Sequence, residues 1–227
     1  MSHARFAASL SGLLGVLWLA LAFEPYDRKD WLLENALTVL AVGVLAGTYR
    51  RLPLSRVSYL LIFLFLCLHT VGAHYTYSKV PYDAAWESLT GSTLNAQLGW
   101  ERNHFDRVVH LAYGLLLAYP VRELFLRVAG VRGFWGYFLP LDLTMSSSML
   151  YELIEWGAAE LLGGDLGTAY LGTQGDVWDA QKDMALASLG GLIAMCATAF
   201  FNARTKRDFA YEWVESLRVK IPDPPGG

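Results

Sequence analysis

The sequence predicts an all-α fold, a polytopic membrane helix bundle with about six transmembrane helices. Two observations carry this prediction. Of the 227 residues, 54% are hydrophobic and only 17% are charged, which is too apolar for an ordinary soluble domain. Six apolar runs also approach the roughly 20 residues that a helix needs to cross the hydrocarbon core of a bilayer. The runs cover about residues 6–23, 31–49, 54–73, 106–126, 134–161 and 183–201.

The first run, 6–23, permits two interpretations. Arg5, the apolar stretch and the segment Ala20-Leu21-Ala22 resemble a secretory signal peptide with its cleavage site. The run is longer than the apolar region of a usual signal peptide, however, and the polar hairpin from Glu24 to Asp30 leads directly into the second run. These two features favour a retained span over a cleaved leader.

The orientation of the spans follows from the Lys and Arg residues in the loops between them. Counted near the helix ends, nine such residues fall on one side (Arg5, Arg50, Arg51, Arg56, Arg127, Arg132, Arg204, Lys206, Arg207) and five on the other (Arg28, Lys29, Lys79, Arg102, Lys182). We therefore expect a multi-pass protein of the inner (plasma) membrane with both termini in the cytoplasm. The loops 74–105 and 162–182 would then face outward.

The fourth run, 106–126, begins with Asn103 and Asp106, whose spacing of three residues is typical of a helix N-terminal cap. Capping does not account for His110, which follows Asp106 by four residues and lies on the same helical face. A carboxylate that accepts the second N–H of an imidazole is a common partner of a metal-bound or proton-transferring histidine. A hydrogen-bonded core histidine is the alternative interpretation.

The fifth run, 134–161, carries Glu152 and Glu155 on one face, together with Asp142 and the serines 146–148. So polar a helix cannot face lipid on that side, and we expect it at the centre of the bundle.

The sixth run begins with three acids in one line, Asp176, Asp179 and Asp183. Acids in a first helical turn complement the helix dipole, which accounts for Asp176 and Asp179. Asp183 enters the membrane beside a like charge four residues away, and such a pair is repulsive.

The charge balance at this end of the bundle predicts a divalent metal ion. Six acids face only Arg102, Arg107 and Lys182, and an unpaired buried charge costs several kcal/mol. Histidine with carboxylates suits Zn, Mn or Fe, and carboxylates alone suit Mg or Ca. We expect the metal ligands to be His110, Glu152, Glu155 and Asp183, the catalytic residues to be His104, Asp106 and Asp179, and the surrounding pocket to include His74, Tyr75, Asp176 and Arg107.

Two family resemblances follow from these residues. The segments 72–77, 102–110, 151–156 and 172–179 resemble the YjdF-type bacterial inner-membrane family, which implies a six-helix inner-membrane protein and no established activity. More distantly, Asp106-Arg107-x-x-His110 resembles the start of a helix in VanZ-like membrane proteins. Glu155 and Asp183 stand where that pattern has amides, and both differences favour cation binding.

Three classes of function remain open. A metal-dependent enzyme, hydrolase-like, acting on a lipid or an envelope intermediate accounts best for the acid cluster. The alternatives are a non-enzymatic lipid-binding or structural accessory protein and, less favoured, a proton-coupled carrier. The expected partners are membrane lipids and a lipid- or envelope-derived small-molecule substrate, and the net charge of −3 gives no reason to expect nucleic acid. The helices should form one domain, 1–205, followed by a cytoplasmic tail, 206–227, with a disordered end.

Overall fold

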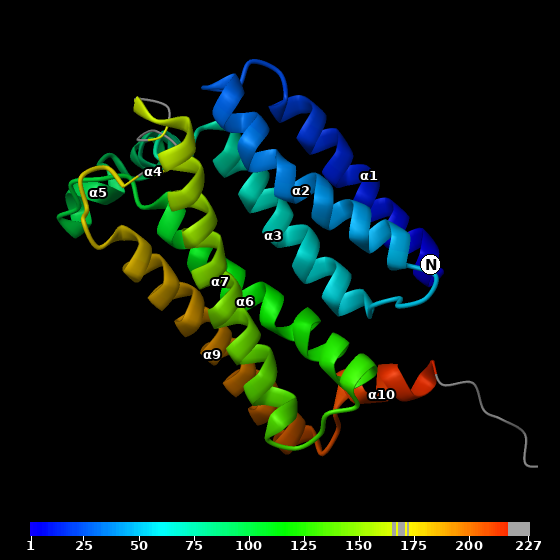
Figure 1. Cartoon of the computed structure of the whole chain (residues 1–227). Helices are drawn as coiled ribbons and strands as arrows, with labels where there is room; N and C mark the ends of the chain where they lie inside the picture. The colour runs from blue at the N-terminus through cyan, green and yellow to red at the C-terminus, as the bar shows by residue number, and fades with distance from the viewer. Residues whose placement is uncertain (165–166, 168–170, 172, 218–227) are drawn as a thin grey trace, which may run out of the picture.

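The helices expected from the hydropathy pattern are present in the computed structural model, which describes residues 1–164, 167, 171 and 173–217. No strand occurs among those residues, which confirms the all-α fold class. Long helices lie side by side, with shorter helices near the two ends of the bundle (Figure 1). The elements are α1 (His3–Leu21), α2 (Arg28–Thr48), α3 (Arg56–His74), α4 (Tyr82–Thr90), α5 (Leu94–Leu98), α6 (Phe105–Leu124), the π-helix η1 (Phe125–Ala129), α7 (Trp135–Leu162), α9 (Asp179–Thr205) and α10 (Phe209–Ser216).

Five helices of the described part of the chain are long and apolar enough to cross a membrane. They are α1, α2, α3, α9 and α6 with its continuation η1. The remaining expected span, the fifth apolar run at 134–161, coincides with α7, whose 28 residues are long enough to cross a bilayer. Its serines 146–148 and its acids Asp142, Glu152 and Glu155 make it more polar than the other five.

The centre of the bundle is α6, which packs against α3, α7 and α9. The helices α1 and α2 each pack against α3, and α7 packs against α6 and α9 (Figure 1). The expectation that the fifth apolar run lies centrally is therefore wrong. One side of α7 turns inward, but Asp142 and Ser146 on this helix are exposed. Polar residues identify the inward side of a helix without fixing how many neighbours it has.

Glycines decide which helices come closest. A Cβ atom at Gly114 of α6 would lie 1.9 Å from the carbonyl oxygen of Ala187, and one at Gly190 of α9 would lie 2.2 Å from that of Leu111. No side chain fits at either position, so the two backbones touch there, as small residues commonly allow in membrane bundles. This contact holds the N-terminal halves of α6 and α9 next to each other.

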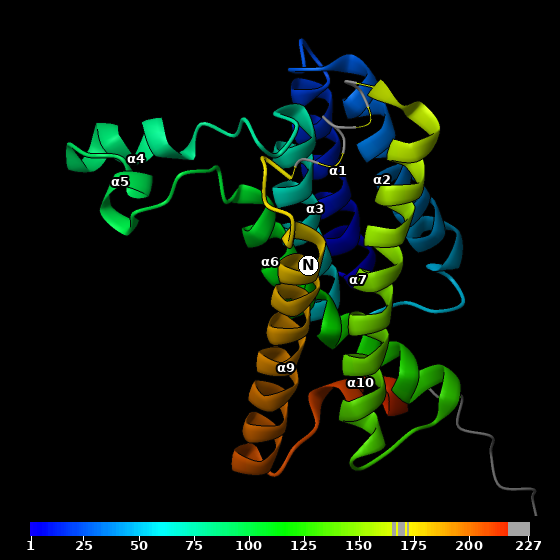
Figure 2. The same ribbon diagram turned by 60° about the vertical axis from the view of Figure 1, so that its left-hand side comes forward.

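The chain between α3 and α6 forms an arm that projects sideways from the bundle, as Figure 2 shows. The arm consists of α4 and α5, two short helices within the segment that the sequence indicated as a loop. Thr93 caps α5 by accepting a hydrogen bond from the Ala96 N–H, and Asp83 accepts one from the Asn95 N–H and so ties the two helices together.

Opposite the arm, α10 closes the bundle through a buried arginine. Arg122 of α6 is 1% exposed, donates two hydrogen bonds to the carboxylate of Asp208, and lies 4.4 Å above the centre of the Tyr137 ring. Its neighbour Glu123 is equally buried and accepts hydrogen bonds from Ser55 N–H at 2.6 Å and Ser58 Oγ at 2.5 Å. The helix α10 lies within the expected tail, and residues 218–227 lie outside the described part of the chain.

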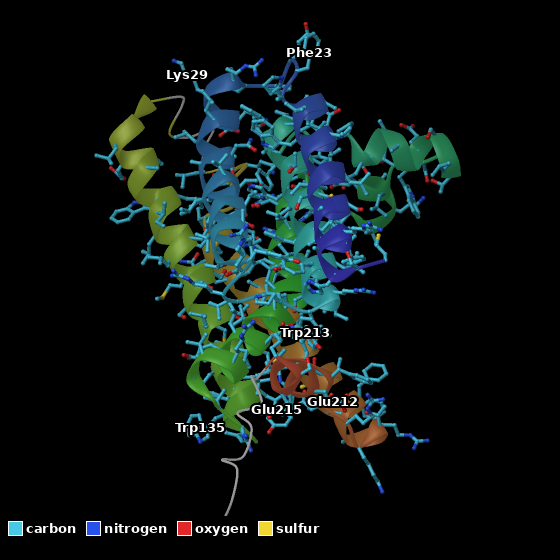
Figure 3. All side chains as sticks on the ribbon, turned by 90° about the vertical axis from the view of Figure 1, so that its right-hand side faces the viewer. Phe23, Lys29, Trp135, Glu212, Trp213 and Glu215 are labelled. Carbon is cyan, nitrogen blue, oxygen red and sulfur yellow. The ribbon has the colours of Figure 1, made fainter. Side chains whose placement is uncertain are left out.

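Both described termini lie at this α10 end. The His3 ring stacks on Trp213 of α10 with ring centres 5.0 Å apart, and His3 Nε2 is 2.8 Å from the Leu54 carbonyl oxygen. Figure 3 shows Trp213 far from Phe23 and Lys29, which lie at the arm end. The chain therefore enters and leaves the bundle on the same side.

Candidate functional site

The centre of the candidate site is His110, one turn into α6. Its Nε2 atom is 3.5 Å from Asp106 Oδ1 on the same helix and 3.5 Å from Glu152 Oε1 on α7. Both separations are too long for good hydrogen bonds and leave room for an intervening atom. The expected cap by Asn103 and Asp106 is wrong, because the N-cap residue of α6 is His104, which makes no side-chain capping hydrogen bond. Asn103 Oδ1 instead accepts the Phe105 N–H at 3.0 Å.

A third carboxylate comes from α9. One ligand atom each from Asp106, His110 and Asp183 lie within 4.8 Å of one another. Asp183 is 2% exposed, and its Oδ1 atom has no hydrogen-bond partner among the described residues. The same holds for Oε1 of Glu152. These four residues form what we call the acid cluster, and its geometry suits one small cation.

Basic residues of this end are paired at the rim, closer to the arm. Arg102 forms an ion pair with Asp179, and Arg107 forms one with Asp176. Lys182 Nζ is 2.6 Å from Asp176 Oδ2. The hydrogen bond from Lys182 and another from the Trp178 N–H lower the pKa of Asp176 to about 2. We call these five residues the rim.

The rim leaves the acid cluster without a basic partner. Arg102, Arg107 and Lys182, the three basic residues expected near the six acids, are bound to Asp176 and Asp179. Within the described residues, Asp106 and Glu152 form no ion pair other than that with His110, and Asp183 forms none. The excess of negative charge predicted for this end of the bundle is thus concentrated in the buried acid cluster.

A cavity of about 300 Å³ adjoins the acid cluster between α2, α3, α6 and α7. Asp106 and His110 belong to both, and Glu155 of α7 faces the cavity. A volume of this size is at the lower end of the range for small-molecule sites. The polar side chains around it come from all four helices, for example Glu34, Thr38, His69, His110, Ser148 and Glu155.

Several polar residues of this cavity were missed in the sequence. Glu34 of α2 is 4% exposed and accepts a hydrogen bond from Tyr151 Oη at 3.3 Å. His69 of α3 bonds to Tyr77 Oη, and Asp30 is also buried. Asp30 and Glu34 are four residues apart on one face of α2, a signal hidden because Asp30 was assigned to the preceding hairpin.

Other expected pocket residues have different neighbours. His74 Nδ1 is 2.7 Å from the Leu21 carbonyl oxygen, and its ring packs edge-on against Tyr75. The His104 ring packs against Trp100 with ring centres 4.3 Å apart, and burial together with Arg107 and Arg102 lowers the pKa of its imidazole. Neither histidine lines the cavity. The structure thus gathers Asp106, His110, Glu152 and Asp183, sets Glu155 beside them in the cavity, and places Asp176, Asp179 and Arg107 at the rim.

Comparison with known proteins gives two matches. The model of the family described as "Predicted membrane protein (DUF2238)" matches residues 6–204. "Inner membrane protein YjdF" of Escherichia coli (strain K12) is 38% identical over 197 residues, which cover 86% of this chain and 90% of that protein. No solved structure matches. Neither match names VanZ, so that distant resemblance stays a prediction.

Proposed function

We propose that this chain, which belongs to the family described as predicted membrane protein (DUF2238), is a metal-dependent enzyme of the bacterial inner membrane. The inner-membrane location is carried over from the E. coli relative, whose name states it. The proposed reaction is hydrolysis of a lipid or of an envelope-derived small molecule, carried out at the acid cluster and in the adjoining cavity.

One observation carries the proposal, the unpartnered buried oxygen of Asp183. A carboxylate that is 2% exposed and faces two other acids costs several kcal/mol if it is ionised and unpaired. A divalent cation removes that cost, because it replaces the repulsion between Asp106 and Asp183 by attraction to a common centre. His110 supplies a nitrogen ligand, which favours Zn²⁺, Mn²⁺ or Fe²⁺ over Mg²⁺ or Ca²⁺.

The cavity would hold a substrate next to the cation. A bound cation would supply positive charge at the reacting bond and lower the pKa of a coordinated water. Asp106, His110 and Asp183 would hold it, with Glu152 as a fourth ligand. Glu155 faces the cavity next to this cluster and would accept the proton of the attacking water. In this proposal neither Asp179, a residue of the rim, nor His104, which lies beside Arg107, touches the substrate.

Elemental analysis of the detergent-purified full chain tests the proposal. We expect about one equivalent of a divalent metal in the parent protein and less than about a tenth in Asp183→Asn, which removes a ligand charge. Asp142→Asn is the matched control, since it changes the same residue type on the exposed side of α7. It should retain the parent content.

Two results would contradict the proposal. One is a parent protein with less than about a tenth of an equivalent of any metal and no thermal stabilisation on addition of Zn²⁺, Mn²⁺, Mg²⁺ or Ca²⁺. The other is an unchanged metal content in Asp183→Asn.

A further inference from the structure

Two hydroxyl groups inside the cavity differ from the other buried hydroxyls of the bundle. Thr70 and Thr144 each donate to the carbonyl oxygen four residues earlier, at 2.6 and 2.8 Å, as buried hydroxyls on helices commonly do. Thr38 and Ser148 line the cavity, are 5% and 2% exposed, and have no hydrogen-bond partner among the described residues. A buried hydroxyl without a partner is costly, so this pair indicates a missing polar group.

The two hydroxyls lie at matched depth on opposite walls. Tyr151 of α7 bonds to Glu34 of α2 across the cavity. Thr38 follows Glu34 by four residues on a helix that runs from the arm end, and Ser148 precedes Tyr151 by three residues on a helix that runs toward it. Each is therefore about one helical turn, roughly 5 Å, further from the arm end than the bonded pair.

Polarity along the cavity changes in a fixed order. Asp106 and Glu155 lie toward the arm end, and Thr38 with Ser148 lie at the intermediate level. Beyond this level the same helices contribute apolar side chains, among them Ala41 of α2 and Leu117 of α6. The order is charge, then neutral hydroxyl, then hydrocarbon, which is the order of a glycerolipid from headgroup through ester to acyl chain.

We propose that the cavity binds an ester-linked bilayer lipid, whose ester groups accept hydrogen bonds from Thr38 and Ser148. A carbonyl oxygen is a hydrogen-bond acceptor, so a lipid with two ester groups supplies one acceptor to each hydroxyl. The headgroup then lies beside the acid cluster, and the start of the acyl chain lies along Ala41 and Leu117. This inference names the substrate class of the proposed enzyme. Only the reaction on the lipid rests on the proposed function, and binding of the lipid does not. Ether-linked and isoprenoid lipids lack this carbonyl.

The α2–α7 boundary provides a route for such a lipid. Among the described elements α2 packs against α3, and its bond to α7 is made by the side chains of Glu34 and Tyr151. A chain that enters between the two helices need not cross the packed interface of α6 with α9.

The test compares dioleoyl phosphatidylethanolamine with its diether analogue, which has the same headgroup and no ester carbonyls. Binding to the purified full chain in detergent is measured by native mass spectrometry. Two neutral hydrogen bonds predict about tenfold tighter binding of the diester lipid by the parent protein. The double variant Thr38→Val, Ser148→Ala should lose this preference, and the control Thr70→Val, whose hydroxyl is already satisfied, should keep it.

Equal binding of both lipids by the parent overturns the proposal, as does a preference for the diether or a preference retained by the double variant. Because the double variant removes two unpartnered hydroxyls, we expect it to melt no lower than the parent in lipid-free detergent. A marked loss of stability would mean that both hydroxyls are satisfied within the protein and would also overturn it. Metal content, measured on the same samples, should not change. Failure of the lipid proposal can therefore be distinguished from failure of the metal proposal.

Discussion

At the scale of single residues, the position of His110 between carboxylates of two helices is the central feature. Asp106 and Glu152 are equally far from its Nε2 atom, and Asp183 completes the group. If these residues form the proposed metal site, like-charge repulsion holds the metal-free protein below its attainable stability. Substitutions that keep the shape of a carboxylate side chain and remove its charge distinguish like-charge repulsion from stabilising ion pairs.

We expect Asp183→Asn and Glu155→Gln to raise the melting temperature in the presence of chelator, because each removes one charge from a buried acidic group. For a chain of this length the rise should be about 2–4 °C per kcal/mol of relieved repulsion. Asp183→Asn should lose both metal binding and function, whereas Glu155→Gln should lose function and keep the metal. Asp179→Asn is the control, because it breaks the ion pair with Arg102 and should lower the melting temperature. Melting of Asp183→Asn or Glu155→Gln well below the parent in chelator would favour a purely structural role.

The rim should respond to acid in a different range. Because the pKa of Asp176 is lowered to about 2, its contribution to stability is fully present above the ordinary value of 3.8 and is lost as the pH falls through about 2. Melting curves of the parent protein should therefore show a decline between about pH 4 and pH 2 that is smaller in Asp176→Asn. Arg107, Arg102 and Lys182 face this carboxylate. An identical decline in both proteins would show that the rim pairing does not contribute.

At the scale of elements, the arm presents apolar side chains that nothing in the described chain covers. Leu89 of α4 is 82% exposed, and Trp86, one turn earlier, is also exposed. The arm leaves the bundle at one end of the spans (Figure 2), where aromatic residues commonly lie among lipid headgroups. Its apolar side should therefore rest on the bilayer surface.

A spin label at Leu89 should show oxygen accessibility typical of the membrane interface in lipid vesicles, since this side chain points to the apolar side of α4. The matched control is a label at Glu87, about half a turn round the same helix. It should remain accessible to a water-soluble nickel reagent. Equal water accessibility at the two positions would place the arm in solvent.

The sequence predicted where the helices lie along the chain better than which helices pack together. The expected run 134–161 coincides closely with α7, since hydropathy is a local property. The central position of α6 was not predictable in this way, because it depends on the pairing of Gly114 with Gly190 across the bundle. His110 was identified because its spacing from Asp106 is a local pattern within one helix. The contribution of Glu34 depends on the contact between α2 and α7, which the sequence does not show.

At the scale of the whole molecule, the two ends of the bundle differ in charge and in what they carry. His3 and Trp213 bring both described termini to the α10 end, and the acid cluster lies toward the other. The bias of nine against five in Lys and Arg predicts that the α10 end faces the cytoplasm. The acid cluster then opens toward the outer leaflet.

Cysteine accessibility tests this orientation in intact cells, in a background without Cys67 and Cys196. A cysteine at Lys29, near the arm end (Figure 3), should react with a membrane-impermeant maleimide. A cysteine at Arg204, in the last turn of α9, should react only after the cells are opened. The reverse pattern would invert the topology.

The bond between Arg122 and Asp208 makes completion of the bundle depend on the order of synthesis. These residues are 86 positions apart, so at about 5–20 residues per second the ribosome adds Asp208 about 4–17 s after it adds Arg122. During that interval Arg122 is already part of an inserting helix, where an unpaired charge is unfavourable. A nascent chain released before Asp208 therefore keeps an unpaired arginine in the last part of its fourth apolar span.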